Sequence, residues 1–389
     1  MAMLDPASSS PLYLQLVNVL RHQIDTGTFT AGDRLPPETD LATQFRISRG
    51  TVRQAMDVLV NQGLLERVAG KGTFVTAPEQ RPRSQLIGIV VPYLLDSLTS
   101  AILQGAESVL RRRGYSLIFC HSEGNLDLER YQIERLRREG VCGLLLFPLA
   151  TITESVMLRQ LLPADFPLVL IDRRIPDLQA ASVFVDNFSG AYRVVEHLIS
   201  LGHRRIVCVS LPDQPSSVTE RMRGYEQAVR DAGILPLASV PLALRKDRPP
   251  DNGLPIYGDE EMAPLDRLLR IQEPPTALFC INDFVALGVM QRVLVHGLSI
   301  PHDVAIAGFD DIAIAPYMPV PLTTVAQPKY EIGARAAELL VAQVDNGPQN
   351  DTELVLPTSV VVRESTVLHA EHNDALPLLQ KRARMKGGV

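Results

Sequence analysis

The sequence predicts an α+β winged helix-turn-helix domain at the N-terminus, followed by a two-lobed α/β domain with parallel sheets. Residues 11–76 contain patterns for short helices and a glycine-rich hairpin. From residue 86 to about residue 367, short apolar strands alternate with amphipathic helices, which is typical of βαβ units. The strand-like runs LIGIVV, YSLIFC, GLLLFP, LVLI, RIVCVS, TALFC and VAIAGF are too many for one small sheet, so we expect two lobes with a cleft between them.

These patterns also set the domain boundaries. We expect the first domain at residues 1–76, a linker at 77–85, the second domain at 86–367 and a disordered tail at 368–389. The linker contains two prolines and lacks apolar anchors, which favours an irregular tether. Lobe 1 is expected at residues 86–185 and 327–356, and lobe 2 at 186–326 and 357–367. Residues 245–258 interrupt the alternation and are expected to form an irregular loop.

Composition and charge narrow the class of protein. With 46% apolar residues and a net charge of −6, the chain can bury a large core, and any nucleic-acid contact must come from a local basic patch. The cysteines lie in apolar runs without metal-ligand spacing, so we expect free thiols and no metal. No apolar run approaches the roughly 20 residues that span a bilayer. The N-terminal residues carry no secretion signal, so we expect a cytoplasmic protein without a membrane partner.

The first domain follows from helical periodicity and caps. The first helix carries apolar residues on one face, namely Leu12, Leu16, Val19, Leu20 and Ile24. A second short helix lies in LPPETDLATQF, and a tight turn then leads to Ser48, a good N-cap for a third helix. On the third helix, Arg49 and Arg53 are four residues apart and share an exposed face. Residues 69–72 form the turn of a glycine-rich hairpin.

A helix-turn-helix followed by a hairpin is a DNA-reading arrangement. The N-terminal end of the third helix would enter the major groove, where arginine is suited to guanine. Residues 46–75 carry five basic side chains against two acidic ones, so positive charge is concentrated where DNA would lie: Arg46, Arg49, Arg53, Arg67 and Lys71 against Asp57 and Glu66. The alternative is an amphipathic helix whose arginines are merely solvated.

The stretches PLYLQL, GDRLP, ISRGTVRQAMDVLVNQGLLERV and GKGTFV resemble the GntR-type winged-helix domain. This resemblance implies DNA contacts from Arg49 and Arg53, with Thr51 and Gly70 as supports. Ser48 and Lys71, in the same turn and wing, complete the residues that we expect at DNA. Where the family has an arginine in the second helix, this chain has Thr39. Its hydroxyl can form a hydrogen bond with a phosphate, but it cannot make the charged, bidentate contact of a guanidinium group.

Residues 86–367 resemble the effector domain of LacI/GalR-type repressors, which share the fold of periplasmic sugar-binding proteins. Among the matching stretches are LVLIDRRIP, VDNFSGAYRVVEHLISLGHRRI, PPTALFCINDFVALG and IPHDVAIAGFDD. The pairing of both modules resembles the arabinose-repressor type of regulator. It implies a homodimer on a two-fold symmetric double-stranded DNA operator. It also implies a small-molecule effector, a sugar or sugar derivative, that changes operator affinity.

Candidate effector residues follow from strand ends. In α/β lobes, ligands bind at the carboxyl ends of strands, and a polyol needs fixed donors and acceptors. Six polar residues stand at such ends or at a helix start, and by resemblance they line the sugar pocket: Asp172, Arg173, Arg221, Asn282, Asp310 and Gln327. The two aspartates could instead be helix caps or structural carboxylates, and the two arginines could form interlobe ion pairs. The resemblance also implies hinge crossings near Asp186, Gln327 and Pro357.

Other functions compete with this interpretation. A solute-binding protein without DNA function would share the two lobes but not the winged helix. A GntR-type regulator could sense a non-sugar metabolite, since residues 97–99 replace an aromatic stretch found in sugar-sensing relatives. An aromatic platform could then come from Tyr93, Tyr257 or Phe284. An aminotransferase-like enzyme is disfavoured because no nucleophile–base arrangement is present, so we expect no catalytic residue and no cofactor.

Overall fold

A computed structural model describes residues 4, 11–61, 63–77, 84–94, 97–149, 152–175, 177–212, 215–243, 257–347 and 352–367. The chain divides into two compact units, Met1–Ser84 and Gln85–Val389. Most of the expected linker, most of the expected loop at 245–258 and the tail at 368–389 lie outside the described residues. No described helix is long and apolar enough to cross a membrane.

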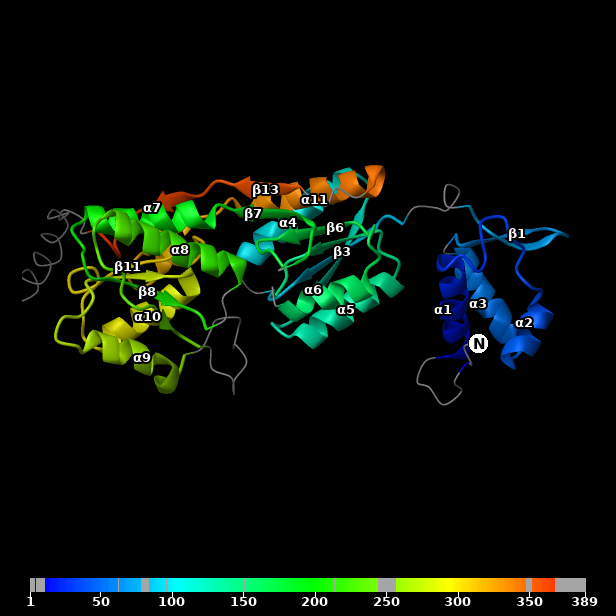
Figure 1. Ribbon diagram of the computed structural model, residues 1–389, viewed down its shortest axis with the longest axis horizontal. Coiled ribbons are helices and arrows are strands. Elements are labelled where there is room, and N and C mark those ends of the chain that lie inside the picture. Colours follow the sequence, from blue (N-terminus) through cyan, green and yellow to red (C-terminus); the bar gives the residue numbers. More distant parts are fainter. Residues whose placement is uncertain are drawn as a thin grey trace, which may run out of the picture. The chain divides into compact units, whose positions relative to one another are not determined.

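The first unit is a three-helix domain with a hairpin (Figure 1). Its elements are α1 (Leu12–Asp25), α2 (Glu38–Phe45), α3 (Arg49–Asn61), β1 (Leu65–Val68) and β2 (Gly72–Val75), the two strands being antiparallel. The buried face of α1 differs from the expected one, because Val17 is buried and Val19 is half-buried. Val17 continues a row with Leu20 and Ile24 at helical spacing, and this row faces the domain core.

Local signals fix the turns of this domain. Arg46 ends α2 in the left-handed conformation (φ 54°), and the Ser48 hydroxyl accepts a hydrogen bond from the Thr51 amide (3.0 Å) at the start of α3. In the wing, Gly72 has φ 121°, and a Cβ placed there would lie 2.7 Å from Nε of Arg34. Only glycine therefore fits this position of the hairpin without displacing Arg34.

Lobe 1 of the second unit is a parallel six-stranded sheet in the order β13-β7-β6-β5-β3-β4. Helices α4 and α11 cover one face of it, and α5 and α6 cover the other (Figure 1). The elements are β3 (Leu86–Val91), α4 (Ser97–Arg112), β4 (Ser116–His121), α5 (Leu126–Arg138), β5 (Gly143–Leu146), α6 (Ile152–Leu161), β6 (Leu168–Ile171), β7 (Ala181–Val185), α11 (Lys329–Asn346) and β13 (Glu353–Leu356).

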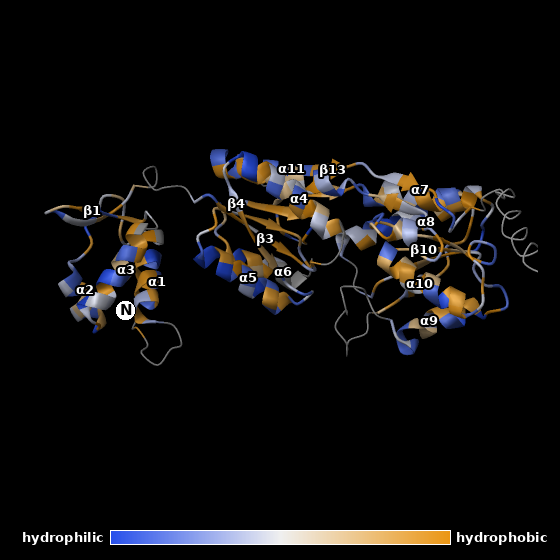
Figure 2. Cartoon of the chain, turned by 180° about the vertical axis from the view of Figure 1, so that it is seen from behind, coloured by the Kyte–Doolittle hydropathy of each residue, from blue (hydrophilic) through white to orange (hydrophobic). Residues whose placement is uncertain are grey.

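Lobe 2 contains a parallel four-stranded sheet, β11-β10-β8-β9, and an antiparallel pair, β12-β14. The strands of this lobe are largely hydrophobic, and its helices carry both hydrophobic and hydrophilic residues on the face in view (Figure 2). The elements are α7 (Asn187–Ser200), β8 (Ile206–Ser210), α8 (Ser216–Asp231), β9 (Val240–Pro241), α9 (Asp259–Leu269), β10 (Ala277–Cys280), α10 (Asp283–Val295), β11 (Ala305–Ala307), the 3₁₀ helix η3 (Ala315–Tyr317), β12 (Thr324–Ala326) and β14 (Ser359–Val361).

The chain passes between the lobes at three places. It leaves the first sheet after β7 and enters α7 of lobe 2, returns from β12 to α11, and leaves again between β13 and β14. Helix α11 lies unusually close to α4, since a Cβ on Gly333 would lie 1.9 Å from the carbonyl oxygen of Ile102. The predicted fold class is confirmed, with a winged helix-turn-helix domain before two α/β lobes.

Candidate functional site

The first candidate surface is the exposed start of α3. Arg49 and Arg53 are both exposed, and the Ser48 and Thr51 hydroxyls lie 2.8 Å apart beside them. The Arg53 guanidinium donates to the Glu38 carboxylate of α2, with Nη2 and Nε at 3.0 and 3.2 Å from Oε2. This exposed ion pair holds Arg53 against α2 and must be exchanged if Arg53 is to bind another acceptor.

The remaining residues expected at DNA lie on α2 and on the wing. Thr39, in the first turn of α2, donates its hydroxyl proton to Asp40 (3.0 Å). Gly70, with φ 73°, and the exposed Lys71 form the tip of the hairpin, where the Lys71 amide donates to Val68 (3.0 Å). Both wing residues are therefore open to solvent at a turn that brings backbone to the surface.

The second candidate site is centred on Arg221, which is buried in α8. Its Nη1 lies 3.1 Å from Oδ1 of Asp310, and its Nε donates to Oδ1 of Asn187 (2.8 Å). Nη1 also donates to the carbonyl oxygen of Ile281 (2.9 Å). The guanidinium carbon lies 3.8 Å from the ring centroid of Phe309, so the cation stacks on an aromatic face.

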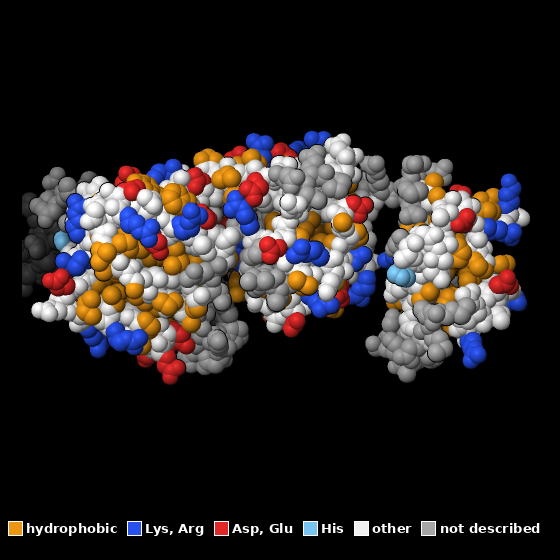
Figure 3. Space-filling model, in the orientation of Figure 1, with side chains coloured by type: hydrophobic (Ala, Val, Ile, Leu, Met, Phe, Trp, Pro, Cys, Tyr) orange, Lys and Arg blue, Asp and Glu red, His pale blue; other side chains and the backbone are white. Residues whose placement is uncertain are grey.

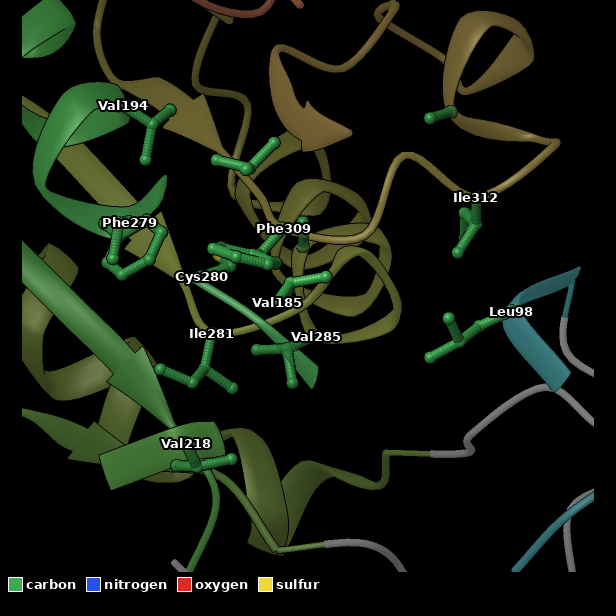
Figure 4. Close-up of a cluster of buried hydrophobic side chains, with 14 of the residues drawn as sticks. Leu98, Val185, Val194, Val218, Phe279, Cys280, Ile281, Val285, Phe309 and Ile312 are labelled. Carbon is green, nitrogen blue, oxygen red and sulfur yellow. The ribbon is translucent and has the colours of Figure 1, made fainter. Parts of the chain in front are cut away.

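That aromatic ring belongs to the apolar core of lobe 2. Phe309 is fully buried and lies among Val185, Val194 and Cys280 (Figure 4). In the same view, Leu98 of α4 and Ile312 of lobe 2 extend toward each other. The polar cluster around Arg221 therefore has an apolar support beneath it.

Asp310 is the acidic partner in this cluster. It is a non-glycine residue with φ 116°, held there by its amide, which donates to Val325 (2.9 Å). Its Oδ1 also accepts a hydrogen bond from Nε2 of Gln327 (2.6 Å). Burial raises the pKa of Asp310 to about 6; Arg221 acts against this shift and the negative charge of Asp172 adds to it.

Asp172 supplies a second buried carboxylate, from lobe 1. It follows β6, has φ 66°, and is 4% exposed. Its Oδ2 lies 3.5 Å from Nε of Arg173, while its Oδ1 has no hydrogen-bond partner among the described residues. Oε1 of Gln327 is likewise buried without a partner in the described part of the chain. Both acceptors therefore need a hydrogen-bond donor that the described residues do not supply.

The other two predicted effector residues bond within their own lobes. Nη1 of Arg173 donates to the carbonyl oxygen of Pro148 (3.1 Å), and its guanidinium lies 5.0 Å from the ring centroid of Phe147. Oδ1 of Asn282 accepts from the Val285 amide (2.8 Å) and so caps α10. The structure thus joins Arg221, Asp310 and Gln327 by direct contacts, and Asp172 lies close enough to Asp310 to raise its pKa. Arg173 and Asn282 bond to groups outside this cluster.

A cavity of about 170 Å³ opens beside this cluster. Residues of both lobes line it: Asp172, Arg174, Phe184, Val185 and Val355 from lobe 1, and Asp186, Asn187, Phe188, Ser216, Ser217 and Glu220 from lobe 2. The sequence analysis did not identify Phe184 or Ser217; for Ser217 the preceding Pro215 was an available signal of a helix start, whereas the apolar run around Phe184 has no alternation that would assign its face. Of the three expected aromatic candidates, Tyr257 packs against Gly288 within lobe 2.

Comparison with known proteins gives two family matches. Residues 12–75 match the bacterial regulatory proteins of the gntR family, and residues 195–366 match the periplasmic binding protein-like domain. The arabinose metabolism transcriptional repressor of Geobacillus stearothermophilus is 31% identical over 362 residues, which cover 92% of this chain and 98% of the relative. The chain belongs to this family of repressors.

Solved structures agree with this repressor assignment. A LacI family transcriptional regulator from Enterococcus faecium, with bound ribose, is 26% identical with a TM-score of 0.58, covering 72% of this chain and 98% of that one. The lac repressor dimer bound to operator is 21% identical, with a TM-score of 0.61 and coverage of 73% and 95%, and shows the shared fold. Because its relatives are repressors, the chain is a transcriptional repressor and not an enzyme.

The raised pKa of Asp310 makes the stability of the sensor domain depend on pH. In an unfolded chain, aspartate has a pKa near 3.9, so between about pH 4 and pH 6 the folded state binds more protons than the unfolded state. Stability contributed by this group therefore falls as pH rises through that window. We expect the wild type to lose about 2–3 kcal/mol relative to Asp310→Asn over the window.

Urea unfolding of the full chain at a series of pH values, following the sensor transition, measures this difference. Glu260→Gln, a change at an exposed residue of α9, serves as the control and should track the wild type at every pH. If the difference in free energy of unfolding between the wild type and Asp310→Asn stays constant from pH 4 to pH 6.5, burial does not raise the pKa of Asp310.

Proposed function

We propose that this repressor binds a two-fold symmetric operator as a homodimer, and that a small polyhydroxylated effector bound between the lobes changes its operator affinity. The observation that carries the effector proposal is the pair of orphaned buried acceptors, Oδ1 of Asp172 and Oε1 of Gln327. Hydroxyl groups of a sugar or sugar derivative would supply the missing donors. Because the protein acts on genomic DNA, we place it in the cytoplasm.

Charge supports a ligand with hydroxyl donors. The Asp310 carboxylate lies 3.1 Å from Arg221, and the Asp172 carboxylate lies 3.5 Å from Arg173, so each acidic group of the site already has a cationic neighbour and the site needs no charge from a ligand. A neutral polyol adds none, while its hydroxyls can donate to carboxylates and accept from guanidinium groups. The bound ribose of the E. faecium regulator and the name of the arabinose repressor agree with a sugar.

The effector would act by stabilising one lobe arrangement. Because polar groups of both lobes line the cavity, a ligand that contacts both favours the closed state by its difference in affinity for the two states. Linkage then requires that DNA change effector affinity by the same factor by which effector changes DNA affinity.

Dimerisation follows from how DNA is read. One winged helix contacts too few base pairs to select a site in a genome, and the lac repressor is bound to its operator as a dimer. The nine residues 77–85 span at most about 30 Å, so each reading head stays tethered to its sensor domain. We expect light scattering to give twice the chain mass, 42.8 kDa per chain; a monomer both free and on DNA would rule the homodimer out.

We predict that Arg49 and Arg53 control operator affinity and leave effector affinity unchanged. Because Arg49→Ala and Arg53→Ala each remove a guanidinium that can bind guanine, each should weaken operator binding by about 1–3 kcal/mol and relax specificity at one base pair. Lys71→Ala should instead weaken binding to all duplexes alike. It should also lower the salt slope, which is the slope of log affinity against log salt concentration, by about 1. Fluorescence anisotropy with operator and scrambled duplexes separates these cases, with Arg230→Ala on α8 as a charge-matched control. If both arginine variants bind the operator like the wild type, α3 is not the reading helix.

We predict that Arg221→Ala and Gln327→Ala still bind operator but no longer respond to the effector. Each leaves buried polar groups unpaired in the complex, at roughly 1–3 kcal/mol or more per group. Thermal shifts with arabinose, ribose and their phosphates identify a ligand, since 100 times the Kd stabilises by about 2.7 kcal/mol. Calorimetry on the full chain then compares the variants with Arg230→Ala, which lies on the same helix as Arg221 but is exposed.

Unchanged effector affinity in both variants would place the pocket elsewhere. If nucleobases or amino acids raise the melting temperature and no sugar does, the cleft is still the binding site, but the effector is not a sugar.

A further inference from the structure

Two helices of lobe 1 end in clusters of arginine. The last turns of α4 and α5 and the residue after α4 present six exposed guanidinium groups, which we call the arginine end: Arg111, Arg112, Arg113, Arg135, Arg137 and Arg138. Cations are favoured at helix C-termini, which explains one or two such residues per helix. Three per helix exceed what capping requires.

Both clusters lie beside the point where the chain enters the sensor domain from the winged helix. Helix α4 leads into β4, and α5 leads into β5, the two neighbours of β3 in the sheet. The Ser116 amide donates to the Gln85 carbonyl (2.7 Å), and the Cys142 amide donates to the Leu86 carbonyl (2.8 Å). The starts of β4 and β5 are thus bonded to the first residues after the linker. Figure 3 shows basic side chains at the α5 side of this edge.

Half of these charges lack an acidic partner. Arg111 pairs with Glu107 and Arg135 with Glu139, each at 2.9 Å, and Arg113 lines a hollow with Glu338 and Asp345. The other three bond neutral acceptors, which are Ser108 Oγ for Arg112, the Leu161 carbonyl for Arg137 and the Glu134 carbonyl for Arg138. Within the described residues, the arginine end therefore carries three uncompensated positive charges.

We propose that the arginine end binds the phosphate backbone of DNA beside the operator, which adds sensor-domain contacts to those of the winged helix. This inference rests on the proposed DNA binding. The linker keeps Thr76 within about 30 Å of Leu86, a length that would allow one DNA duplex to contact both units. Exposed guanidinium groups match phosphate geometry, and in a chain with a net charge of −6 such a patch is a local attractor for a polyanion.

The linker sequence extends the same charge pattern. Arg81 and Arg83 stand in it, and within residues 77–85 no acidic residue follows Glu79. A duplex occupying both would release more counterions than the winged helix alone can release. The measurable consequence is a steeper salt dependence of DNA affinity in the full chain.

The test uses the full-length protein and a 40-base-pair duplex of mixed sequence, with affinity measured by anisotropy from about 50 to 200 mM NaCl. In the double variant Arg112→Ala/Arg138→Ala, the salt slope should fall by about 0.9 for each phosphate that is no longer neutralised, or up to about 1.8 per protomer. Arg112→Lys/Arg138→Lys keeps the charge and should restore the slope. Arg223→Ala/Arg230→Ala removes the same charge from α8 of lobe 2 and should leave the slope unchanged.

Arg49→Ala, measured in parallel, separates the two levels of the proposal. A lowered slope in Arg49→Ala together with a wild-type slope in Arg112→Ala/Arg138→Ala overturns the role of the arginine end and leaves the winged helix intact. An equal decrease in the lobe 2 control also overturns it, because the effect then reflects net charge only. If the wild type does not bind the duplex at any of these salt concentrations, DNA binding itself fails and this inference fails with it.

Discussion

The sensor domain depends on a buried cation, Arg221, whose acidic partner Asp310 is also buried. Arg221 is stacked on Phe309 and bonded to Asp310, Asn187 and a main-chain carbonyl, so its position is fixed from several directions. Removing one partner of a buried charge pair typically destabilises a protein by about 3–5 kcal/mol. The second carboxylate, Asp172, comes from the other lobe and raises the pKa of Asp310. The two carboxylates therefore lie close enough to interact electrostatically across the boundary between the lobes.

Backbone strain supports the same centre. Asp172 and Asp310 both have positive φ, a conformation that non-glycine residues adopt at a cost of order 1–3 kcal/mol. The strands on either side hold them there, since the Asp172 amide donates to Val183 and the Asp310 amide donates to Val325. Beneath them, Asp283 is fully buried and accepts from Thr324 (2.5 Å) and from the Ile312 amide (2.9 Å), which holds the loop after β11.

Much of this could be predicted from sequence, because strand ends are local signals. Asp172, Asp310 and Gln327 each follow an apolar strand, and parallel topology brings such ends to one edge. The support for Arg221 could not be predicted in this way. Asn187 and Phe309 reach it from α7 and the end of β11, and only tertiary packing brings these segments together. Phe184 could not be assigned to a face because ASVFV is a fully buried strand without alternation, and Val17 lies where the apolar spacing of α1 fits two adjacent helical faces.

Helix α11 can act as a stiff rod through lobe 1. It begins two residues after Gln327 and runs for 18 residues, roughly 27 Å at the usual helical rise, to Asp345 and Asn346 beside Arg113. The close approach of Gly333 to the Ile102 carbonyl leaves no room for a side chain between α11 and α4, so the two helices pack backbone to backbone there. A small displacement at Gln327 would then be transmitted along α11, so that a molecule bound at one end of the lobe would displace residues at the other end.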